Sequence, residues 1–554
     1  MRVIAALLLT LLAQATALAA QTDQPQTNEQ RVDQLFVDYN KPGSPGCALG
    51  VIQNGAFVYR KGYGAGSLEL GTPLSSQSVF YMGSVSKQFT AASVVLADEQ
   101  GFLSLDDDIR KYIPELPDYG KSITLRQMLH HTSGLREYET LEALSGQSDR
   151  NLRPTSELID LIARQKAPNF APGTEFQYSN TNYFLLAEVI KRATGKPLST
   201  FAAENIFQPL GMTHTRFYDD NSVVVPGRVP AYAAGHNGTF LVDWSTNLDR
   251  VGAGGLLANI DDLLLWDQNF YDNHLGKGTL IKVMETRGVL ADGTQIPYML
   301  GLEEGTYRGL PIIEHSGGHF GYGAELLRFP QQHFTVACLC NLDQADPVTL
   351  AHSVANVYLR GLLQAPDVPA SSSASHFAFE PSRFAGKYHS ARYRTMRLVT
   401  VKDGRLYVGN AAYDRIGPNV FSTPGPWGSK AVFEESGGEK KLTISSDGEI
   451  WWTGSRVNAA DVKEAPLADY TGTYTSAELK VTYKITVANG NLELLGYGDS
   501  AVTLRSSIKD EFVSGQLPVI GYIAVLFQRS GRDHVSGLKL FSAGVRDLQF
   551  EKGN

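Results

Sequence analysis

The last third of the chain contains one sequence pattern twice, and this repeat limits its possible folds more than any other feature. Residues 384–390 (FAGKYHS) match residues 470–476 (YTGTYTS) at an offset of 86. The same offset pairs Val401 with Val487, Gly404 with Gly490, and Leu406 with Leu492. Short alternating apolar segments between Gly, Asp and Asn turns predict antiparallel strands. We therefore expect two similar all-β modules, each closed into a small lipocalin-like barrel because closure removes exposed strand edges.

The module boundaries follow from composition. Residues 363–376 are rich in Pro, Ala and Ser, which is typical of a linker. They divide a region at 29–362 from the two β modules at 377–463 and 464–554. At 554 residues, with 43% hydrophobic composition, the chain is long enough for more than one core. A single larger barrel built from two half-repeats is the alternative for the β region.

A serine followed three residues later by a lysine, Ser84 and Lys87, begins an apolar segment. A serine hydroxyl is a poor nucleophile at neutral pH and needs a base or cation within hydrogen-bond reach. The residues that continue the segment at helical spacing are Val85, Phe89, Ala92 and Leu96. We expect a helix that begins at Ser84, with Lys87 on the same face and the Ser84 N–H placed to bind an oxyanion. Alone, the pattern also fits a capped helix with a solvated lysine.

Two further motifs follow in order. The first is Tyr178-Ser179-Asn180. A tyrosine acts as a general base only if a nearby cation keeps its phenol partly ionised, and Lys87 is the candidate cation.

The second motif is His315-Ser316-Gly317, which follows the apolar segment 310–313 and predicts a strand. Glycines beside a polar strand edge let a substrate backbone come close. We expect the N–H of Gly318 to complete an oxyanion hole with that of Ser84.

With these motifs in this order, the chain resembles the penicillin-recognising serine hydrolases, which include class C β-lactamases, DD-peptidases, D-aminopeptidases and related esterases. The resemblance covers about residues 30–362. The further segments that carry it are 80–83 (FYMG), 103–107 (LSLDD), 123–129 (ITLRQML), 131–135 (HTSGL) and 209–212 (PLGM). It implies an α/β (α+β) β-lactamase-like transpeptidase fold, in which helices flank an antiparallel sheet and a helical subdomain is added.

The resemblance also implies roles for single residues. Ser84 would be the acylated nucleophile, and Lys87 and Tyr178 the proton-transfer pair. The residues implied to bind substrate are Asn180, His315, Ser316 and Gly317. The backbone N–H groups of Ser84 and Gly318 would form the oxyanion hole. Whether Lys87 or Tyr178 takes the first proton stays open.

His315 departs from the β-lactamase pattern. β-Lactamases and carboxypeptidases of the family usually carry a lysine there, which helps to hold the carboxylate of a β-lactam or of a terminal D-alanine. A histidine is mostly neutral at pH 7, so the sequence favours substrates without that carboxylate. If a neutral His315 is required, activity should fall below about pH 6.5. The alternative is that His315 only packs on the strand.

We therefore expect a serine hydrolase that cleaves amides or esters of D-amino acids or short peptides. The alternatives are a broad esterase, a weak class C-like β-lactamase, and an inactive peptide- or cell-wall-binding homologue. A hydrolase domain followed by two β modules resembles the D-aminopeptidases, in which a loop of the last barrel reaches the cleft and restricts it to substrates with a free amino terminus. The other possibility is that the barrels stabilise the hydrolase domain or bind a partner.

Residues 1–19 predict a secretory signal peptide, with Arg2, an apolar core at 3–12 and small residues at 17–19. We expect export to a bacterial periplasm or to the medium, and no membrane span. The net charge of −8 gives no indication of a nucleic-acid or anionic-membrane partner. The expected partner is a small-molecule or short-peptide substrate, and the sequence does not indicate an oligomeric state.

We expect no cofactor and no metal. The pairs His130/His131 and His315/His319 could suggest a metal, but the sequence has no His-Glu-x-x-His helix, and the glycines between 315 and 319 argue against a helical face. The chain contains three cysteines, Cys47, Cys338 and Cys340. Cys338 and Cys340 alternate on one strand and are expected to fill the core rather than to pair. No disulfide framework is expected.

Overall fold

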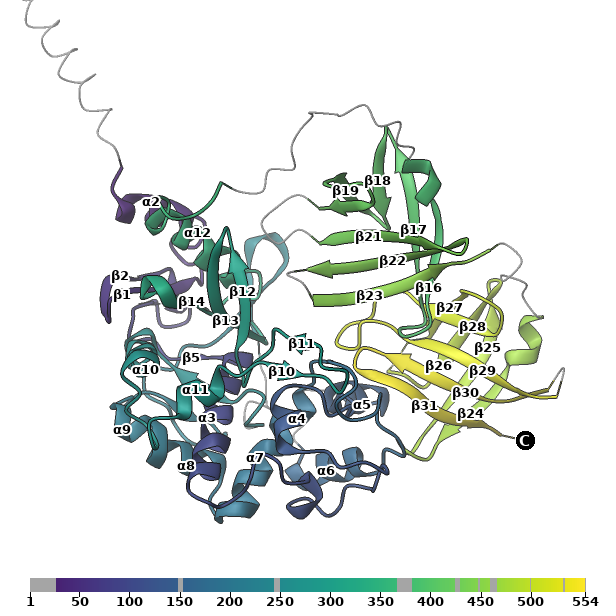
Figure 1. The fold of residues 1–554 in the computed structure, drawn as a ribbon, viewed down its shortest axis with the longest axis horizontal. Coiled ribbons are helices and arrows are strands. Elements are labelled where there is room, and N and C mark those ends of the chain that lie inside the picture. The colour runs from purple at the N-terminus through teal and green to yellow at the C-terminus, as the bar shows by residue number, and fades with distance from the viewer. Residues whose placement is uncertain are drawn as a thin grey trace, which may run out of the picture.

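A six-stranded antiparallel sheet forms the centre of the first body of the molecule (Figure 1). The computed structural model describes residues 26–147, 153–243, 250–365, 381–423, 429–446, 449–458, 466–498, 500–531 and 534–553. The expected signal peptide and most of the expected linker lie outside these ranges. The strand order is β12 (Glu303–Tyr307), β13 (Leu310–His319), β14 (Tyr322–Phe329), β15 (Phe334–Cys340), β1 (Cys47–Gln53) and β2 (Ala56–Tyr63).

Helices cover both faces of this sheet. Helices α2 (Asn28–Leu35) and α12 (Pro347–Tyr358) pack on one face, and α10 (Ile260–Asp272) contacts β1 and β15 on the other. A helical subdomain adds α4 (Leu125–Leu129), α5 (Tyr138–Leu144), α6 (Thr155–Ala163) and α7 (Asn180–Thr194). The expected α/β (α+β) β-lactamase-like fold is confirmed.

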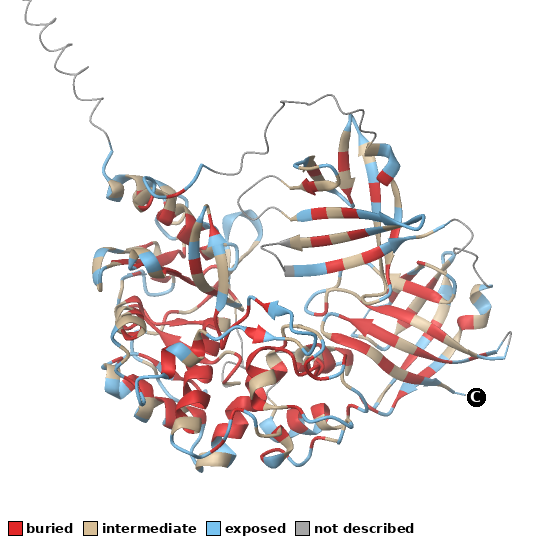
Figure 2. Ribbon diagram, viewed as in Figure 1, coloured by how far each residue is buried: buried red, intermediate tan, exposed pale blue. Residues whose placement is uncertain are grey.

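The predicted nucleophile segment differs in one detail. Ser84 lies in a 3-10 turn, Gly83–Val85, and the α-helix α3 begins after it at Ser86–Glu99. Residues at i and i+3 are eclipsed in a 3-10 turn, so Lys87 still lies over Ser84. The helix is buried on all sides, including its polar residues, as the red ribbon in Figure 2 shows. The expected one-sided apolar stripe is therefore only part of its buried surface.

The β region forms two separate closed barrels, so the alternative of one larger barrel is wrong. The first contains β16 (Gly386–Ser390), β17 (Thr395–Lys402), β18 (Arg405–Val408), β19 (Ala411–Arg415), β20 (Val420–Ser422), β21 (Lys430–Ser436), β22 (Glu439–Ser446) and β23 (Glu449–Arg456). The second contains β24 (Gly472–Ser476), β25 (Val481–Ala488), β26 (Asn491–Leu495), β27 (Val502–Ser506), β28 (Glu511–Ser514), β29 (Ala524–Ser530), β30 (His534–Ser542) and β31 (Val545–Lys552). The exact boundaries of the modules remain predictions.

The sequence repeat has a structural basis in both barrels. The hydroxyl of Tyr388 donates to the Phe384 carbonyl at 3.0 Å, and that of Tyr474 donates to the Tyr470 carbonyl at 2.7 Å. Each bond ties the first strand of a barrel to the 3-10 turn before it. Both tyrosines are fully buried, so their hydroxyls need these acceptors.

The expectation for the cysteines is wrong for one of them. Cys340 forms a disulfide with Cys47, its direct partner across strands β15 and β1. Cys338 is a buried free thiol, as expected. The pairing was not evident in the sequence because it depends on the register of two strands whose cysteines are 293 residues apart.

The second barrel packs against the helical subdomain. Leu141 and Leu144 of α5 and Leu161 of α6 belong to the same apolar cluster as the interior of that barrel. A buried ion pair crosses the contact, where Arg136 donates to Glu478 at 2.7 Å and both side chains are 2% exposed. The barrel and the subdomain therefore share one core.

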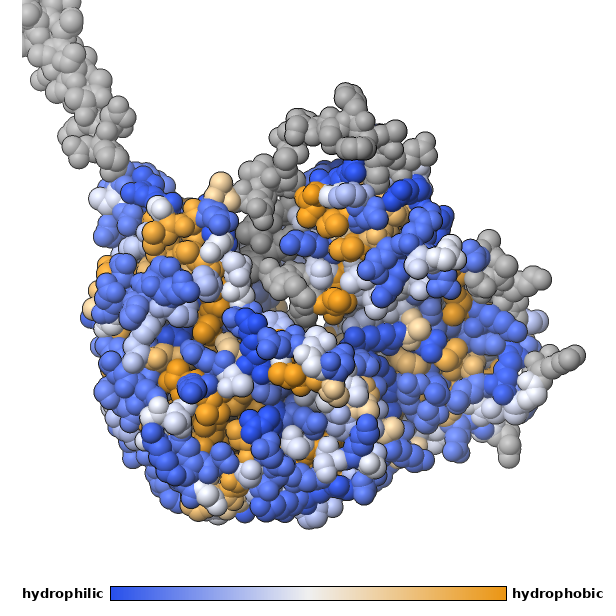
Figure 3. Space-filling view, viewed as in Figure 1, coloured by the Kyte–Doolittle hydropathy of each residue, from blue (hydrophilic) through white to orange (hydrophobic). Residues whose placement is uncertain are grey.

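Among the residues that the structure describes, no helix is both long and apolar enough to cross a bilayer. Hydrophilic side chains cover most of the face drawn in Figure 3, and apolar ones are scattered between them.

Candidate active site

The Ser84 turn is held against strand β13 by two glycines. Gly83 has a φ of +52°, and a Cβ on it would lie 2.6 Å from the Gly318 nitrogen. A Cβ on Gly317 would lie 2.1 Å from the Met82 carbonyl oxygen and 2.9 Å from the Ser84 nitrogen. Gly317 is therefore required for contact with the protein's own backbone, whereas we expected it to admit a substrate backbone. A Cβ on Gly318 would instead make only an ordinary contact, 3.9 Å from the Tyr322 carbonyl oxygen, and Gly318 lines the cleft.

Lys87 lies at the centre of the site. Its Nζ donates to the Ser84 Oγ at 2.9 Å, to the Asn180 Oδ1 at 2.8 Å and to the Ala253 carbonyl at 2.9 Å. Burial lowers the pKa of Lys87 to about 7, although the carboxylates of Glu139 and Glu137 oppose this change. Close to neutral pH, Lys87 is therefore able to accept a proton from the hydroxyl that it contacts.

Tyr178 is the second group in contact with Ser84. Its hydroxyl is hydrogen-bonded with Ser84, and its ring centroid lies 4.8 Å from the Lys87 Nζ. Burial raises the pKa of Tyr178 well above 10. The expectation of a partly ionised tyrosine is therefore wrong, because burial dominates and nearby groups such as Glu137 act in the same direction.

Asn180 is the first residue of α7, directly after the tyrosine motif. Its Nδ2 donates to the Glu139 carboxylate at 3.2 Å, and its backbone N–H donates to the Glu137 carboxylate at 2.6 Å. Burial raises the pKa of Glu137 to about 7. Two carboxylates thus lie beside the serine and lysine, which the motif analysis did not indicate.

His315 lies on β13 and is 2% exposed. Its Nδ1 is 2.7 Å from the Ser316 carbonyl, which can only accept, so Nδ1 carries the proton and Nε2 accepts from the Tyr298 hydroxyl at 3.1 Å. Burial lowers the pKa of His315 to about 3. His315 is therefore neutral throughout the useful pH range, and the predicted loss of activity near pH 6.5 through its protonation is wrong. The Ser316 side chain is exposed beside it.

A cavity of about 300 Å³ opens at Ser84. Its lining includes Ser84, Tyr138, Glu139, Asn180, Arg250, Gly318, His319 and Val519. Val519 comes from the loop between β28 and β29 of the second barrel. A larger cavity of about 640 Å³ is lined in part by Phe320, but its lining has no serine in contact with a lysine, so the Ser84 cavity is the candidate site.

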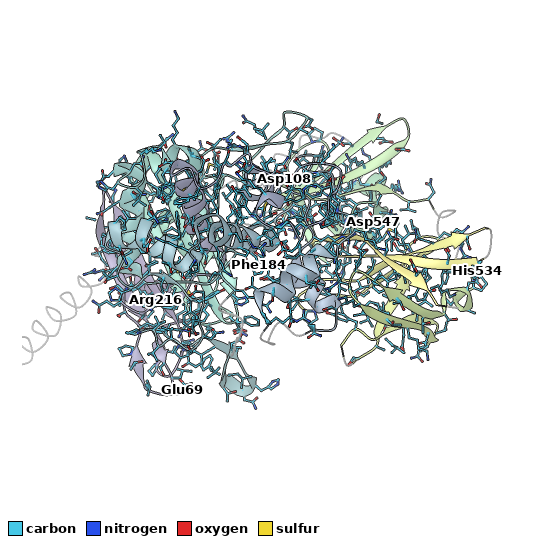
Figure 4. All side chains as sticks on the ribbon, turned by 90° about the horizontal axis from the view of Figure 1, so that it is seen from below. Glu69, Asp108, Phe184, Arg216, His534 and Asp547 are labelled. Carbon is cyan, nitrogen blue, oxygen red and sulfur yellow. A yellow bond between two sulfur atoms is a disulfide. The ribbon has the colours of Figure 1, made fainter. Side chains whose placement is uncertain are left out.

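Both barrels also hold the loop that precedes Tyr178. Arg546 of β31 and Arg392, which follows β16, bind the Glu175 carboxylate at 3.0 and 2.9 Å. Arg546 also donates to the Gln177 side chain at 2.9 Å. Figure 4 shows Asp547, the neighbour of Arg546 in β31, where the barrels meet the hydrolase domain.

Among the described residues, the one cluster of three potential metal ligands consists of the three cysteines, and the disulfide occupies two of them. His131 was considered above as a possible metal ligand, but its contacts indicate a different role. Its Nδ1 accepts from the Ser179 N–H at 3.2 Å, and its ring lies 4.3 Å from that of Tyr178. It therefore supports the tyrosine loop.

A comparison with known proteins identifies the family to which this chain belongs. The family described as Beta-lactamase matches residues 32–359. The chain belongs to the beta-lactamase family. It is a serine hydrolase of that family.

Curated relatives of this beta-lactamase family member include "Penicillin-binding protein 4*" of Bacillus subtilis, which is 28% identical over 66% of this chain and 83% of its own length. "D-aminopeptidase" of Brucella anthropi is 27% identical over 54% of this chain. The match spans 56% of that relative's length.

Solved structures agree on the fold. The octameric penicillin-binding protein homologue from Pyrococcus abyssi has a TM-score of 0.53 at 21% identity and covers 86% of this chain and 98% of its own. D-amino acid amidase from Ochrobactrum anthropi SV3 has a TM-score of 0.51 at 20% identity and covers 60% of this chain and 99% of its own.

Proposed function

We propose that this chain hydrolyses amides or esters of D-amino acids or short peptides through an acyl-enzyme on Ser84. Neutral Lys87 takes the hydroxyl proton as Ser84 Oγ bonds to the substrate carbonyl carbon, and Tyr178 passes a proton to the leaving group. The N–H groups of Ser84 and Gly318 bind the oxyanion. Water then releases the acyl group. The contact of a buried lysine, with its pKa near 7, to the serine supports this mechanism.

The substrate preference rests on one observation, the Glu139 carboxylate beside Asn180 in the cleft. A carboxylate there stabilises an ammonium group on the acyl part of a substrate. The amide of Asn180 contacts the substrate amide. The relatives named D-aminopeptidases support both the free amino group and the D configuration. Val519 of the last barrel lines the same cavity, which supports a role of that barrel in restricting substrate length.

The alternatives have less support. A β-lactam carboxylate would meet neutral His315 in place of a lysine, which disfavours a β-lactamase. A broad esterase would make no use of Glu139. An inactive binding protein would not need the Ser84–Lys87 contact. We also propose that the chain is exported through the leader expected at 1–19.

A panel of chromogenic substrates tests the proposal. We expect cleavage of D-alanine p-nitroanilide over its L partner, with no turnover by Ser84→Ala. The variant Glu139→Gln should raise KM for the free D-anilide about tenfold, and N-acetylation of the substrate should have a similar effect in the native protein only. Turnover of short p-nitrophenyl esters without any D-anilide cleavage would instead establish the esterase, and cleavage of a chromogenic cephalosporin alone would establish the β-lactamase.

A further inference from the structure

The larger cavity of about 640 Å³ has no role in the function proposed above. Phe320 contributes to the lining of both this cavity and the Ser84 cavity. His319 lines the Ser84 cavity, and its ring centroid lies 4.0 Å from that of Phe320. The ring centroid of Tyr81 in the Ser84 cavity is 5.9 Å from that of Tyr322 in the larger one. The two cavities therefore meet at a group of aromatic side chains.

The walls of the larger cavity are fixed to the segment that leads to Ser84. The N–H of Val229 donates to the Val79 carbonyl at 3.1 Å, five residues before Ser84. The hydroxyl of Tyr322 donates to the Val229 carbonyl at 2.6 Å. The other elements of the wall are β3 (Ala65–Ser67), β4 (Thr72–Pro73) and the end of β8 (Phe240–Val242). The cavity is therefore part of the hydrolase domain and has a set position relative to Ser84.

Glu69 and Arg228, two charged residues of this lining, already have partners within the protein. The hydroxyls of Ser67 and Tyr232 donate to the Glu69 carboxylate at 3.1 and 2.6 Å. The guanidinium of Arg228 lies 4.9 Å from the ring centroid of Tyr218. Polar groups that are already satisfied gain little from a ligand, so binding would depend on the apolar side chains. These include Leu70, Pro73, Val229, Ala231, Val242 and Phe320.

We propose that the larger cavity is a second binding site for the substrate, and that it takes an extended apolar group which passes Phe320 from the Ser84 cavity. This inference rests on the proposed acyl transfer at Ser84. The substrate class is the amide or ester that carries a long alkyl or aromatic group. The reaction at Ser84 is unchanged, because the larger cavity only holds a part of the substrate that does not react.

The size of the effect follows from the apolar surface that the ligand would bury. Each methylene group that leaves water for an apolar site strengthens binding about threefold to fourfold. Leu70 in the lining is 79% exposed, so the cavity is open to solvent on one side and only about half of this free energy is expected. Four added methylene groups should therefore strengthen binding roughly tenfold.

The test compares n-butylboronic acid with n-octylboronic acid, which differ only in the length of one alkyl chain. The boron accepts an electron pair of the Ser84 Oγ, the hydroxyl proton passes to Lys87, and no bond at boron breaks. The single chain then lies where the site has room for it, whichever part of a substrate carries the apolar group. We measure both dissociation constants by calorimetry with the full chain at pH 8. The octyl acid should bind about tenfold more tightly than the butyl acid.

Two variants fill the larger cavity, and one matched variant does not. Val242→Trp and Thr72→Trp each add a large side chain to the lining, and Thr72 is exposed, so the protein should tolerate that change. In both variants the two acids should bind about equally. Leu241→Trp is the matched control, because Leu241 precedes Val242 in β8, is 61% exposed and is not part of the described lining. That control should keep the tenfold difference.

Equal binding of the two acids by the native chain, or no binding of either, would overturn the inference. A tenfold difference that persists in Val242→Trp and Thr72→Trp would also overturn it. Labelling of each variant by a fluorophosphonate shows that Ser84 remains reactive and the protein folded. Because the boronic acids carry no amino acid, they separate this question from the proposed function. If the D-anilides are not cleaved while the octyl acid is still preferred, only the D-aminopeptidase proposal fails.

Discussion

The pH dependence of acylation should follow Lys87. Burial brings the pKa of this lysine from 10.5 to about 7, so about half of the molecules hold a neutral amine at pH 7. A base works only when it is deprotonated, so kcat/KM should rise with pH and level off above pH 8. Below the pKa the neutral fraction falls tenfold for each pH unit. From pH 8 to pH 5 we therefore expect a loss of about a hundredfold.

The carboxylates around Lys87 give this prediction a second measurable part. Glu139 is the largest electrostatic influence that raises the pKa of Lys87. Removing its charge in Glu139→Gln should lower that pKa, and the acid limb should move to lower pH by roughly half to one unit. His315→Gln should leave the limb in place, because His315 is already neutral above about pH 4.

The assay is hydrolysis of an uncharged p-nitrophenyl ester between pH 5 and pH 9. This substrate has no group that titrates in the range and no ammonium group for Glu139 to bind, so the pH dependence of kcat/KM reports on the protein alone. Lys87→Arg should lose activity by at least about a thousandfold, because a guanidinium stays protonated. A limb that moves with His315→Gln, or one that Glu139→Gln does not move, would refute the assignment of Lys87 as the base.

Two further predictions concern the support of the site. Replacing Cys47 by Ala should lower the free energy of unfolding of the hydrolase domain by about 2–5 kcal/mol, because the disulfide with Cys340 closes a loop of 293 residues; an unchanged urea midpoint would contradict this. Arg546→Gln should lower kcat about tenfold with little change in KM, because it releases the loop before Tyr178; a change in KM alone would argue against a positioning role.

The grouping of Ser84, Lys87, Tyr178 and Asn180 could be predicted because the proposed chemistry requires a local pattern. Ser84 and Lys87 must lie one turn apart, and Tyr178 and Asn180 stand in one short motif, so order and spacing were sufficient. The two barrels were predictable for a similar reason, since a repeat of sequence records a repeat of structure.

Other features depend on contacts between distant segments. Glu139 and Val519 meet in one cavity although 380 positions separate them in the sequence, and neither belongs to a motif that indicates a cleft. The ionisation of Tyr178 was predicted wrongly because the sequence shows a cation nearby but does not show the extent of burial. The sequence HTSGL near residue 131 marked the segment that leads to Glu139, but not the direction of its side chain.

The core that α5, α6 and the second barrel share can form only late in the synthesis of the chain. Leu141, Leu144 and Leu161 can reach their apolar partners only after residues 470–552 have been made. Contacts of this sequence separation form late in folding. Val519, which lines the cavity, and the ion pair of Arg546 with Glu175 also form only at that stage. A nascent or C-terminally truncated chain would therefore hold Ser84 and Lys87 without a finished cleft, and full activity would itself report that synthesis had reached the end of the last barrel.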